Sequence, residues 1–90
     1  MTAPWHIEIR PPARRDLHRL PDKIAAAVIE FLGGSLAENP RRVGRPLGRD
    51  LLGVWTARRG SYRILYRIDD RARVVNVVRV DHRRDVYRPR

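Results

Sequence analysis

Arginines are the side chains of this sequence best suited to chemistry, and their unbalanced charge lies in its second half. Residues 1–40 hold five basic and five acidic side chains, so the formal net charge of +10 arises from residues 41–90. The guanidinium group is a planar, permanently charged fork that fits phosphate oxygens. Such a basic field favours nucleic acid or an acidic protein as partner. An anionic membrane fits less well, because that half contains no basic amphipathic helix.

The stretch at residues 59–70 places some of these arginines on a strand. Its alternation gives one face to Tyr62, Ile64, Tyr66 and Ile68, and the other to Arg63, Leu65 and Arg67. A second strand, over residues 73–80, follows after a short turn and leads into Asp81-His82-Arg83-Arg84-Asp85-Val86-Tyr87. Pairing the two strands as a hairpin would bring arginines of both, a histidine and a tyrosine into one neighbourhood.

The first forty residues supply the elements that must position this cluster. Alternating apolar residues predict a strand over residues 5–9, which Pro11-Pro12 ends. Apolar residues at helical spacing then predict a short helix stopped by Leu20-Pro21. A longer helix is expected over residues 22–37, with its last turns weakened by Gly33-Gly34. Residues 41–53 are expected to form a basic loop, and residues 54–59 a strand.

This order of elements predicts an α+β fold: an N-terminal strand, a two-helix hairpin, and a three-stranded antiparallel meander that completes one sheet. Ninety residues correspond to a single domain, 1–90, with one core. Without cysteine there is no disulfide or thiolate metal site, and we expect neither a metal nor a cofactor. No signal peptide or membrane-spanning run is visible, so we expect a cytoplasmic protein that does not enter membranes.

Several short motifs, taken in order, resemble the RelE/ParE superfamily of toxin–antitoxin toxins. They are Ala13-Arg14-Arg15-Asp16-Leu17, Asn39-Pro40, Pro46-Leu47 with Gly53-Val54-Trp55, Gly60-Ser61-Tyr62-Arg63-Ile64-Leu65-Tyr66, and His82-Arg83-Arg84-Asp85-Val86-Tyr87. Their order and spacing cover nearly the whole chain. The tyrosine–arginine strand, followed by a His-Arg pair and a terminal tyrosine, favours the RelE branch. The resemblance implies a RelE-like fold.

The resemblance also implies a function. A RelE-type toxin enters the ribosomal A site, cuts the mRNA there, and is silenced by a cognate, RelB-like antitoxin; operator DNA is bound only through the toxin–antitoxin complex. The family's catalytic surface matches Arg63, Arg83 and Tyr87, and Arg58 matches a basic position. Where some members carry two strand lysines, this sequence has Val54 and Thr56.

RNA can be cleaved when one of its own 2′-hydroxyl groups attacks the neighbouring phosphate. This reaction needs in-line placement of the attacking and leaving oxygens, proton transfer, and stabilisation of a doubly charged phosphorane. We expect Arg63 and Arg83 to stabilise the phosphate, and Tyr87 to stack on a base or donate a proton. His82 is a possible acid or base, because histidine titrates near neutral pH. Unless the strand ends by Val80, however, His82 and Arg83 point to opposite faces.

The remaining arginines are expected to form a general field that attracts RNA phosphates. This field comprises Arg58, Arg59, Arg67, Arg79 and Arg84. Two alternatives stay open on the sequence. One is a ParE-like inhibitor of DNA gyrase that acts by binding, without catalysis. The other is a basic nucleic-acid-binding module that acts as a co-repressor.

Overall fold

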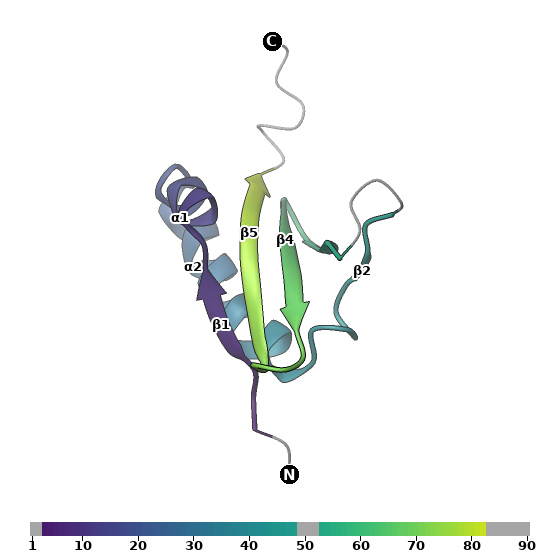
Figure 1. Cartoon of the computed structure of the whole chain (residues 1–90). Helices are drawn as coiled ribbons and strands as arrows, with labels where there is room; N and C mark the ends of the chain where they lie inside the picture. Colours follow the sequence, from purple (N-terminus) through teal and green to yellow (C-terminus); the bar gives the residue numbers. More distant parts are fainter. Residues whose placement is uncertain (1–2, 49–52, 83–90) are drawn as a thin grey trace.

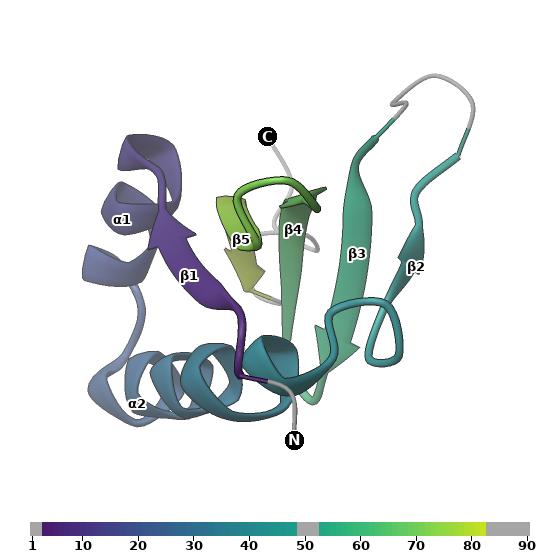
Figure 2. The same ribbon diagram turned by 60° about the horizontal axis from the view of Figure 1, so that its bottom comes forward.

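The structure, a computed structural model, describes residues 3–48 and 53–82. Five strands form one sheet in the order β1-β5-β4-β3-β2, with α2 lying across one face and α1 beside β5 (Figures 1 and 2). The elements are β1 His6–Ile9, α1 Pro11–His18, α2 Asp22–Phe31, the π-helical turn η1 Leu32–Leu36, β2 Arg45–Pro46, β3 Trp55–Arg59, β4 Tyr62–Asp69 and β5 Val74–His82. The predicted α+β fold is confirmed. Within these residues, no helix is long and apolar enough to cross a membrane.

The predicted antiparallel meander consists of β3, β4 and β5, with β4 between its two partners. β1 joins the sheet parallel to β5, pairing His6 with Val74 and Ile9 with Val77. β2 adds an edge strand antiparallel to β3, pairing Arg45 with Thr56. A loop is what the sequence predicts there, since a two-residue strand has no periodicity to detect.

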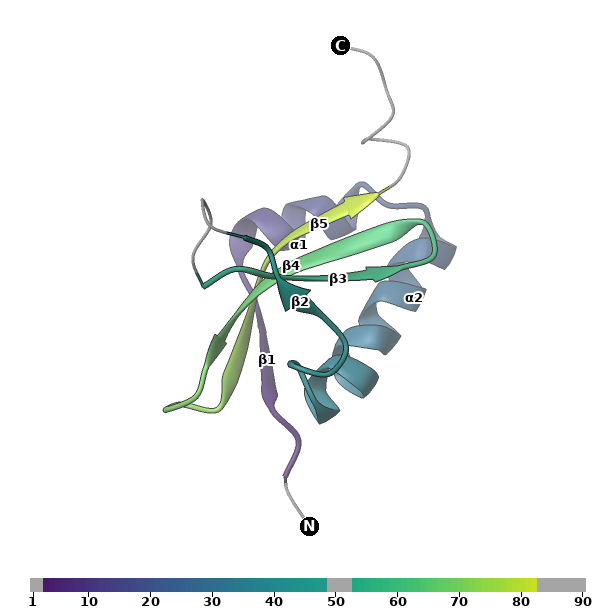
Figure 3. The same cartoon turned by 90° about the vertical axis from the view of Figure 1, so that its right-hand side faces the viewer.

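The core lies between α2 and the helix-facing side of the sheet (Figure 3). Tyr62, Ile64 and Tyr66 of β4 are buried there, as their alternation predicted. On β5 the alternation is interrupted: Leu65 pairs with Arg79 and Tyr66 with Val77, so Val78 is an extra residue. This bulge reverses the orientation of every later side chain on β5.

The second helix does not end at its two glycines. It passes from α2 into η1, and the backbone stays helical through Glu38. Leu32 and Leu36 remain buried across the wider turn. Gly33 and Gly34 have open space where a Cβ would lie, so close packing does not require glycine at either position.

Asp16 of α1 hydrogen-bonds to the backbone of β5 beyond the point where β1 ends. β1 pairs with β5 only as far as Val77, which would leave later backbone N–H groups without a strand partner. The Asp16 carboxylate accepts a hydrogen bond from the Val80 N–H at 2.8 Å. It also accepts bonds from Arg79 Nε at 2.8 Å and Nη2 at 3.2 Å, which raise the pKa of Arg79.

A hydrogen bond from Tyr66 of β4 connects the sheet to the segment that follows the helices, at Pro40. The Tyr66 hydroxyl donates a hydrogen bond to the Pro40 carbonyl at 2.6 Å, and burial raises the pKa of Tyr66 to about 12. Gly44 packs directly against this contact. A Cβ at Gly44 would collide with the Tyr66 hydroxyl oxygen and lie 2.6 Å from the Thr56 carbonyl oxygen, so the close approach requires glycine.

Candidate nucleic-acid interface

The open face of the sheet carries a row of charged side chains: Arg58 on β3, Arg63 on β4 and Asp81 on β5. The strand register places Arg58 opposite Arg63, and Arg63 opposite Asp81, so all three leave the sheet on the side away from the core. Arg63 Nη2 donates a hydrogen bond to Asp81 Oδ2 at 2.9 Å, with the two side chains 35% and 26% exposed. One guanidinium is thereby held on the central strand β4, one residue from its start.

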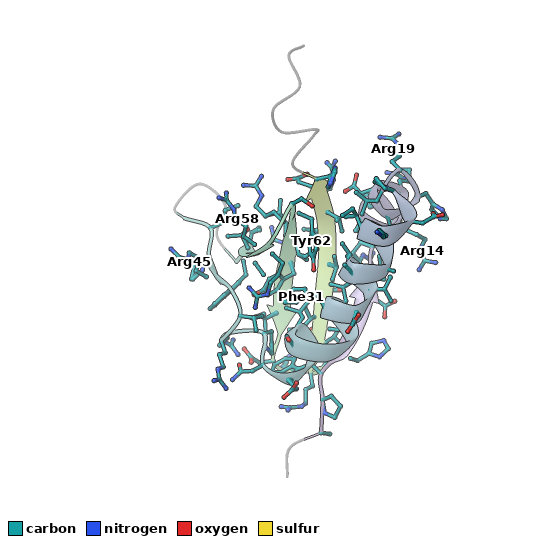
Figure 4. All side chains as sticks on the ribbon, turned by 180° about the vertical axis from the view of Figure 1, so that it is seen from behind. Arg14, Arg19, Phe31, Arg45, Arg58 and Tyr62 are labelled. Carbon is teal, nitrogen blue, oxygen red and sulfur yellow. The ribbon has the colours of Figure 1, made fainter. Side chains whose placement is uncertain are left out.

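A groove of about 550 Å³ opens between this face and the segment at residues 42–47. Its described lining consists of Arg42, Val43, Gly44, Arg45, Leu47, Thr56, Arg58, Arg59 and Arg63. Five of these residues are arginines and none is acidic. Figure 4 shows Arg45 and Arg58 on one side of the molecule, well away from Arg14 and Arg19 at α1. The groove therefore concentrates positive charge at a concave surface, where a phosphate backbone is attracted most strongly.

Two polar atoms of the groove residues are buried without a hydrogen-bond partner in residues 3–48 and 53–82. They are Thr56 Oγ1 and Arg63 Nε. Buried polar side-chain atoms are usually paired in native proteins, so each exception calls for an explanation. Here both exceptions fall in one groove.

The structure brings together some of the arginines assigned to the RNA surface, but not all of them. Arg58 and Arg63 share the groove. Arg59 reaches its lining, but its guanidinium lies over the Phe31 ring at 4.8 Å from the centroid. Arg79 is held by Asp16, and Arg67 lies further along β4, outside the described lining of the groove. The field of arginines is thus divided among separate contacts.

His82 is not placed beside Arg63. β5 continues two residues beyond its predicted end at Val80, and His82 pairs with Tyr62, whose side chain faces the core. Paired residues share a face, so the His82 side chain leaves β5 on the side opposite to Arg63 and Asp81. The other candidates, Arg83, Arg84 and Tyr87, lie outside the described residues.

Tyr62, which lies one residue before Arg63, belongs to the core. Its ring meets Phe31 edge-to-face with the centroids 6.4 Å apart, and its hydroxyl donates a long hydrogen bond of 3.4 Å to the Ala27 carbonyl. Burial raises the pKa of Tyr62. Phe31 and Tyr62 both belong to the buried core cluster. Tyr62 is therefore not available for stacking on a base.

Arg42, Arg45 and Asp81 belong to the site but were not predicted from the sequence. For Arg42 and Arg45 the only signal was their charge, because β2 could not be recognised. For Asp81 there was no usable signal: uninterrupted alternation from the buried Val77 would turn Asp81 toward the core, and only the bulge at Val78 turns it outward. Among the described residues, no three His, Asp or Glu side chains gather so as to hold a metal ion.

Comparison with known proteins identifies the class to which this fold and groove belong. The family model described as "ParE toxin of type II toxin-antitoxin system, parDE" matches residues 7–87. Toxin RelG of Mycobacterium tuberculosis is 55% identical over 94% of this chain and 98% of its own length. Toxin RelE of the same organism is 49% identical over 94% of this chain and 88% of its own length. The class is that of type II toxin–antitoxin toxins.

A solved structure shows the same relationship in three dimensions. The toxin–antitoxin complex RelBE2 from Mycobacterium tuberculosis contains a chain that matches with a TM-score of 0.87 at 55% identity, covering 89% of this chain and 99% of that one. The chain described here belongs to the RelE/ParE family of type II toxin–antitoxin toxins, on its RelE-like branch. The resemblance found in the sequence motifs is thereby confirmed.

Proposed function

We propose that this protein is a metal-independent endoribonuclease that cleaves mRNA in the ribosomal A site and so inhibits translation. A single domain, 1–90, carries the activity in the cytoplasm, where ribosomes are found. The observation that carries the proposal is the setting of Arg63. This guanidinium is fixed by Asp81 and borders a groove in which five of the described lining residues are arginines.

The chemistry assigned to Arg63 is charge stabilisation. When a 2′-hydroxyl attacks the neighbouring phosphate, negative charge grows on the non-bridging oxygens. A cation already held in place stabilises that charge more in the transition state than in the ground state. Arginine stays protonated far above neutral pH, so it is poorly suited to transferring the proton itself. Arg58 contributes attraction for the phosphate from the opposite strand.

The remaining roles belong to the end of the chain. In this proposal Arg83 adds a second charge at the phosphate, and Tyr87 stacks on a base or protonates the leaving oxygen. Acid–base action by His82 stays a prediction, and the position of this residue on the other face of β5 requires any proton path to pass around the end of the sheet.

The proposal includes a protein partner. A relative at 55% identity was solved as a toxin–antitoxin complex, and this supports a cognate, RelB-like antitoxin for the present chain. Its acidic or amphipathic segment would cover part of the basic open face and block RNA. Operator DNA would then be bound through the complex rather than by the toxin alone.

The test of this function is primer extension on ribosomes programmed with a defined A-site codon, beside the same mRNA without ribosomes. We expect cuts within that codon on the ribosome only. Arg63→Ala should slow single-turnover cleavage by about 10²-fold or more, because it removes a charge that acts on the transition state. Arg14→Ala on α1 is the matched control, removing the same charge far from the groove, and should cleave like the wild type.

Two observations favour a second candidate, inhibition of DNA gyrase by binding. The description of the matching family model names a ParE toxin. In addition, Val54 and Thr56 stand at the positions where some RelE members have strand lysines. Intact mRNA on programmed ribosomes, together with inhibition of gyrase supercoiling by the same preparation, would replace the endonuclease with this candidate.

A further inference from the structure

We infer that the outer face of α1 is a binding surface for duplex DNA, which contacts phosphates of both strands through four exposed arginines. They are Arg10, Arg14, Arg15 and Arg19, and together they form the α1 patch. Two of them, Arg14 and Arg19, lie well away from the groove arginines Arg45 and Arg58 in Figure 4. DNA binding by this surface is therefore independent of RNA cleavage.

The fold separates opposite charges that balance each other in the sequence. Within residues 10–19 the one acidic side chain is that of Asp16. This side chain is only 11% exposed and is turned toward β5, where it binds Arg79 and the Val80 N–H. The outer face of α1 is thereby left with arginines and no carboxylate of its own helix, although residues 1–40 hold equal numbers of basic and acidic side chains.

The guanidinium groups of the α1 patch have no partner within residues 3–48 and 53–82. None of the four side chains takes part in the hydrogen bonds, ion pairs or ring contacts of that part of the chain. Figure 4 shows Arg14 and Arg19 extending away from the ribbon. An arginine that serves the fold is held in place, as Arg79 is by Asp16. The α1 patch is instead available to an external anion.

The spacing of the α1 patch fits two nucleic-acid strands better than one. Successive residues of a helix are about 100° apart around its axis, so Arg14 and Arg15 lie on opposite flanks of the outer face. Arg10 and Arg19 lie about one turn from Arg14 and Arg15, respectively, and extend the two flanks. Such diverging side chains cannot follow successive phosphates of a single strand. They can reach the phosphates on the two sides of a duplex groove.

The shape and composition of α1 favour duplex DNA over other partners. A helix is about 10–12 Å wide and the major groove of B-form DNA about 12 Å, whereas the major groove of duplex RNA is too narrow and deep to be read. Residues 10–19 contain no Phe, Tyr or Trp on which the bases of a single strand could stack. The one large apolar side chain exposed in the described part of the chain, Ile29, is on α2, so α1 lacks the apolar centre of a protein interface.

Contacts to phosphates carry no base sequence, so the α1 patch adds affinity at a DNA site that another protein selects. That protein is the antitoxin, a role that rests on the proposed function, whereas the DNA-binding surface itself does not. An antitoxin segment on the open face would leave α1 accessible, because α1 packs into the core on the other side of the sheet through Ala13. The toxin then contributes directly to operator binding by the complex.

The test compares two triple variants, which have the same net charge, on two nucleic acids. Arg14→Glu/Arg15→Glu/Arg19→Glu reverses charges of the α1 patch, and Arg42→Glu/Arg45→Glu/Arg58→Glu reverses charges of the groove. Fluorescence anisotropy reports binding of the purified full-length chain to a blunt-ended DNA duplex and to a non-cleavable single-stranded RNA at one salt concentration. We expect the α1 variant to lose about tenfold more duplex-DNA affinity than the groove variant, and the groove variant to lose more RNA affinity.

Two further variants separate the charge of the α1 patch from the stability of its helix. Glutamate near the C-terminal end of a helix opposes the helix dipole, whereas glutamine does not and has a similar helix propensity. Arg14→Gln/Arg15→Gln/Arg19→Gln should therefore lose duplex-DNA affinity without that destabilisation. Arg14→Lys/Arg15→Lys/Arg19→Lys keeps three cations and should bind duplex DNA like the wild type.

Three results would overturn the inference. Equal losses of duplex-DNA affinity in the α1 and groove variants would mean that DNA responds to total charge. Undiminished DNA affinity in the glutamine variant would assign the α1 patch to an acidic protein. An equal effect of the patch on a duplex RNA would remove the choice of DNA. None of these measurements uses a ribosome. DNA binding through α1 with uncut mRNA would support the α1 patch while rejecting the endonuclease, and cut mRNA with DNA binding independent of α1 would do the reverse.

Discussion

Two aspartates in this protein each hold one strand arginine in place, and the outcome differs. Asp16 binds Arg79 through two nitrogens and also caps the β5 backbone, so Arg79 serves the fold. Asp81 binds Arg63 through one nitrogen, and the Arg63 side chain borders the groove on the open face. At the scale of the residue, the two arginines differ in how many guanidinium nitrogens bind the aspartate. Arg79, which uses two, is structural, and Arg63, which uses one, is a candidate catalytic residue.

Asp81→Ala should separate RNA binding from RNA cleavage. Removing a carboxylate from a basic surface should tighten binding of a non-cleavable RNA. Releasing the Arg63 guanidinium from its fixed position should slow single-turnover cleavage at saturation by about 10- to 100-fold, as loss of positioning does. Asp81→Asn keeps an acceptor oxygen and should recover part of the rate. A uniform loss of binding and rate, with no recovery by asparagine, would contradict a positioning role.

At the scale of the element, sequence periodicity predicted the strands and helices whose apolar residues recur regularly. β1, β3, β4 and both helices were found within a few residues, because apolar residues recur in them at the expected period. The groove was not foreseen. One of its walls depends on the two-residue strand β2, and the outward orientation of Asp81 depends on the bulge at Val78. Both features are set by tertiary pairing, which a local pattern does not encode.

The anchor between β4 and the segment at residues 40–44 makes a pH-dependent prediction. Burial raises the folded-state pKa of Tyr66 from 10.0 to about 12. The folded state therefore favours the protonated Tyr66 hydroxyl more than the unfolded state does. The resulting contribution to the free energy of unfolding is complete below pH 10 and is lost as the pH rises toward 12. Tyr66→Phe should cost about 1–3 kcal/mol at pH 7, because the buried Pro40 carbonyl loses its donor.

The measurement is urea unfolding of the wild type, Tyr66→Phe and Tyr62→Phe between pH 7 and 12. The wild type should lose stability most steeply above pH 10, and Tyr66→Phe should lose less over the same interval. Tyr62→Phe is the comparison variant: burial also raises the pKa of Tyr62, but its hydroxyl makes only a 3.4 Å hydrogen bond, so this substitution should change the pH profile less than Tyr66→Phe does. Parallel pH profiles for the wild type and Tyr66→Phe would show that the Tyr66 hydroxyl is not the group that titrates.

At the scale of the whole molecule, the excess charge is divided by the fold into separate regions. Arg41 is committed to Asp70 through hydrogen bonds of 2.9 and 2.8 Å, which lower the pKa of Asp70. Arg14 and Arg19, at α1, lie on the far side from the groove (Figure 4). Net charge attracts any polyanion from a distance, but only charges gathered along one groove can bind successive phosphates.

The salt dependence of RNA binding should therefore depend on where charge is removed. Arg42→Glu/Arg45→Glu/Arg58→Glu reverses three groove charges, and Arg14→Glu/Arg15→Glu/Arg19→Glu reverses three at α1, with the same change in net charge. For a non-cleavable single-stranded RNA, the groove variant should reduce the slope of log affinity against log salt by about 2, because each phosphate that is no longer neutralised lowers that slope by roughly 0.7. The α1 variant should keep a slope near that of the wild type. Equal reductions in both would mean that RNA responds to the total charge of the molecule and that the groove is not the interface.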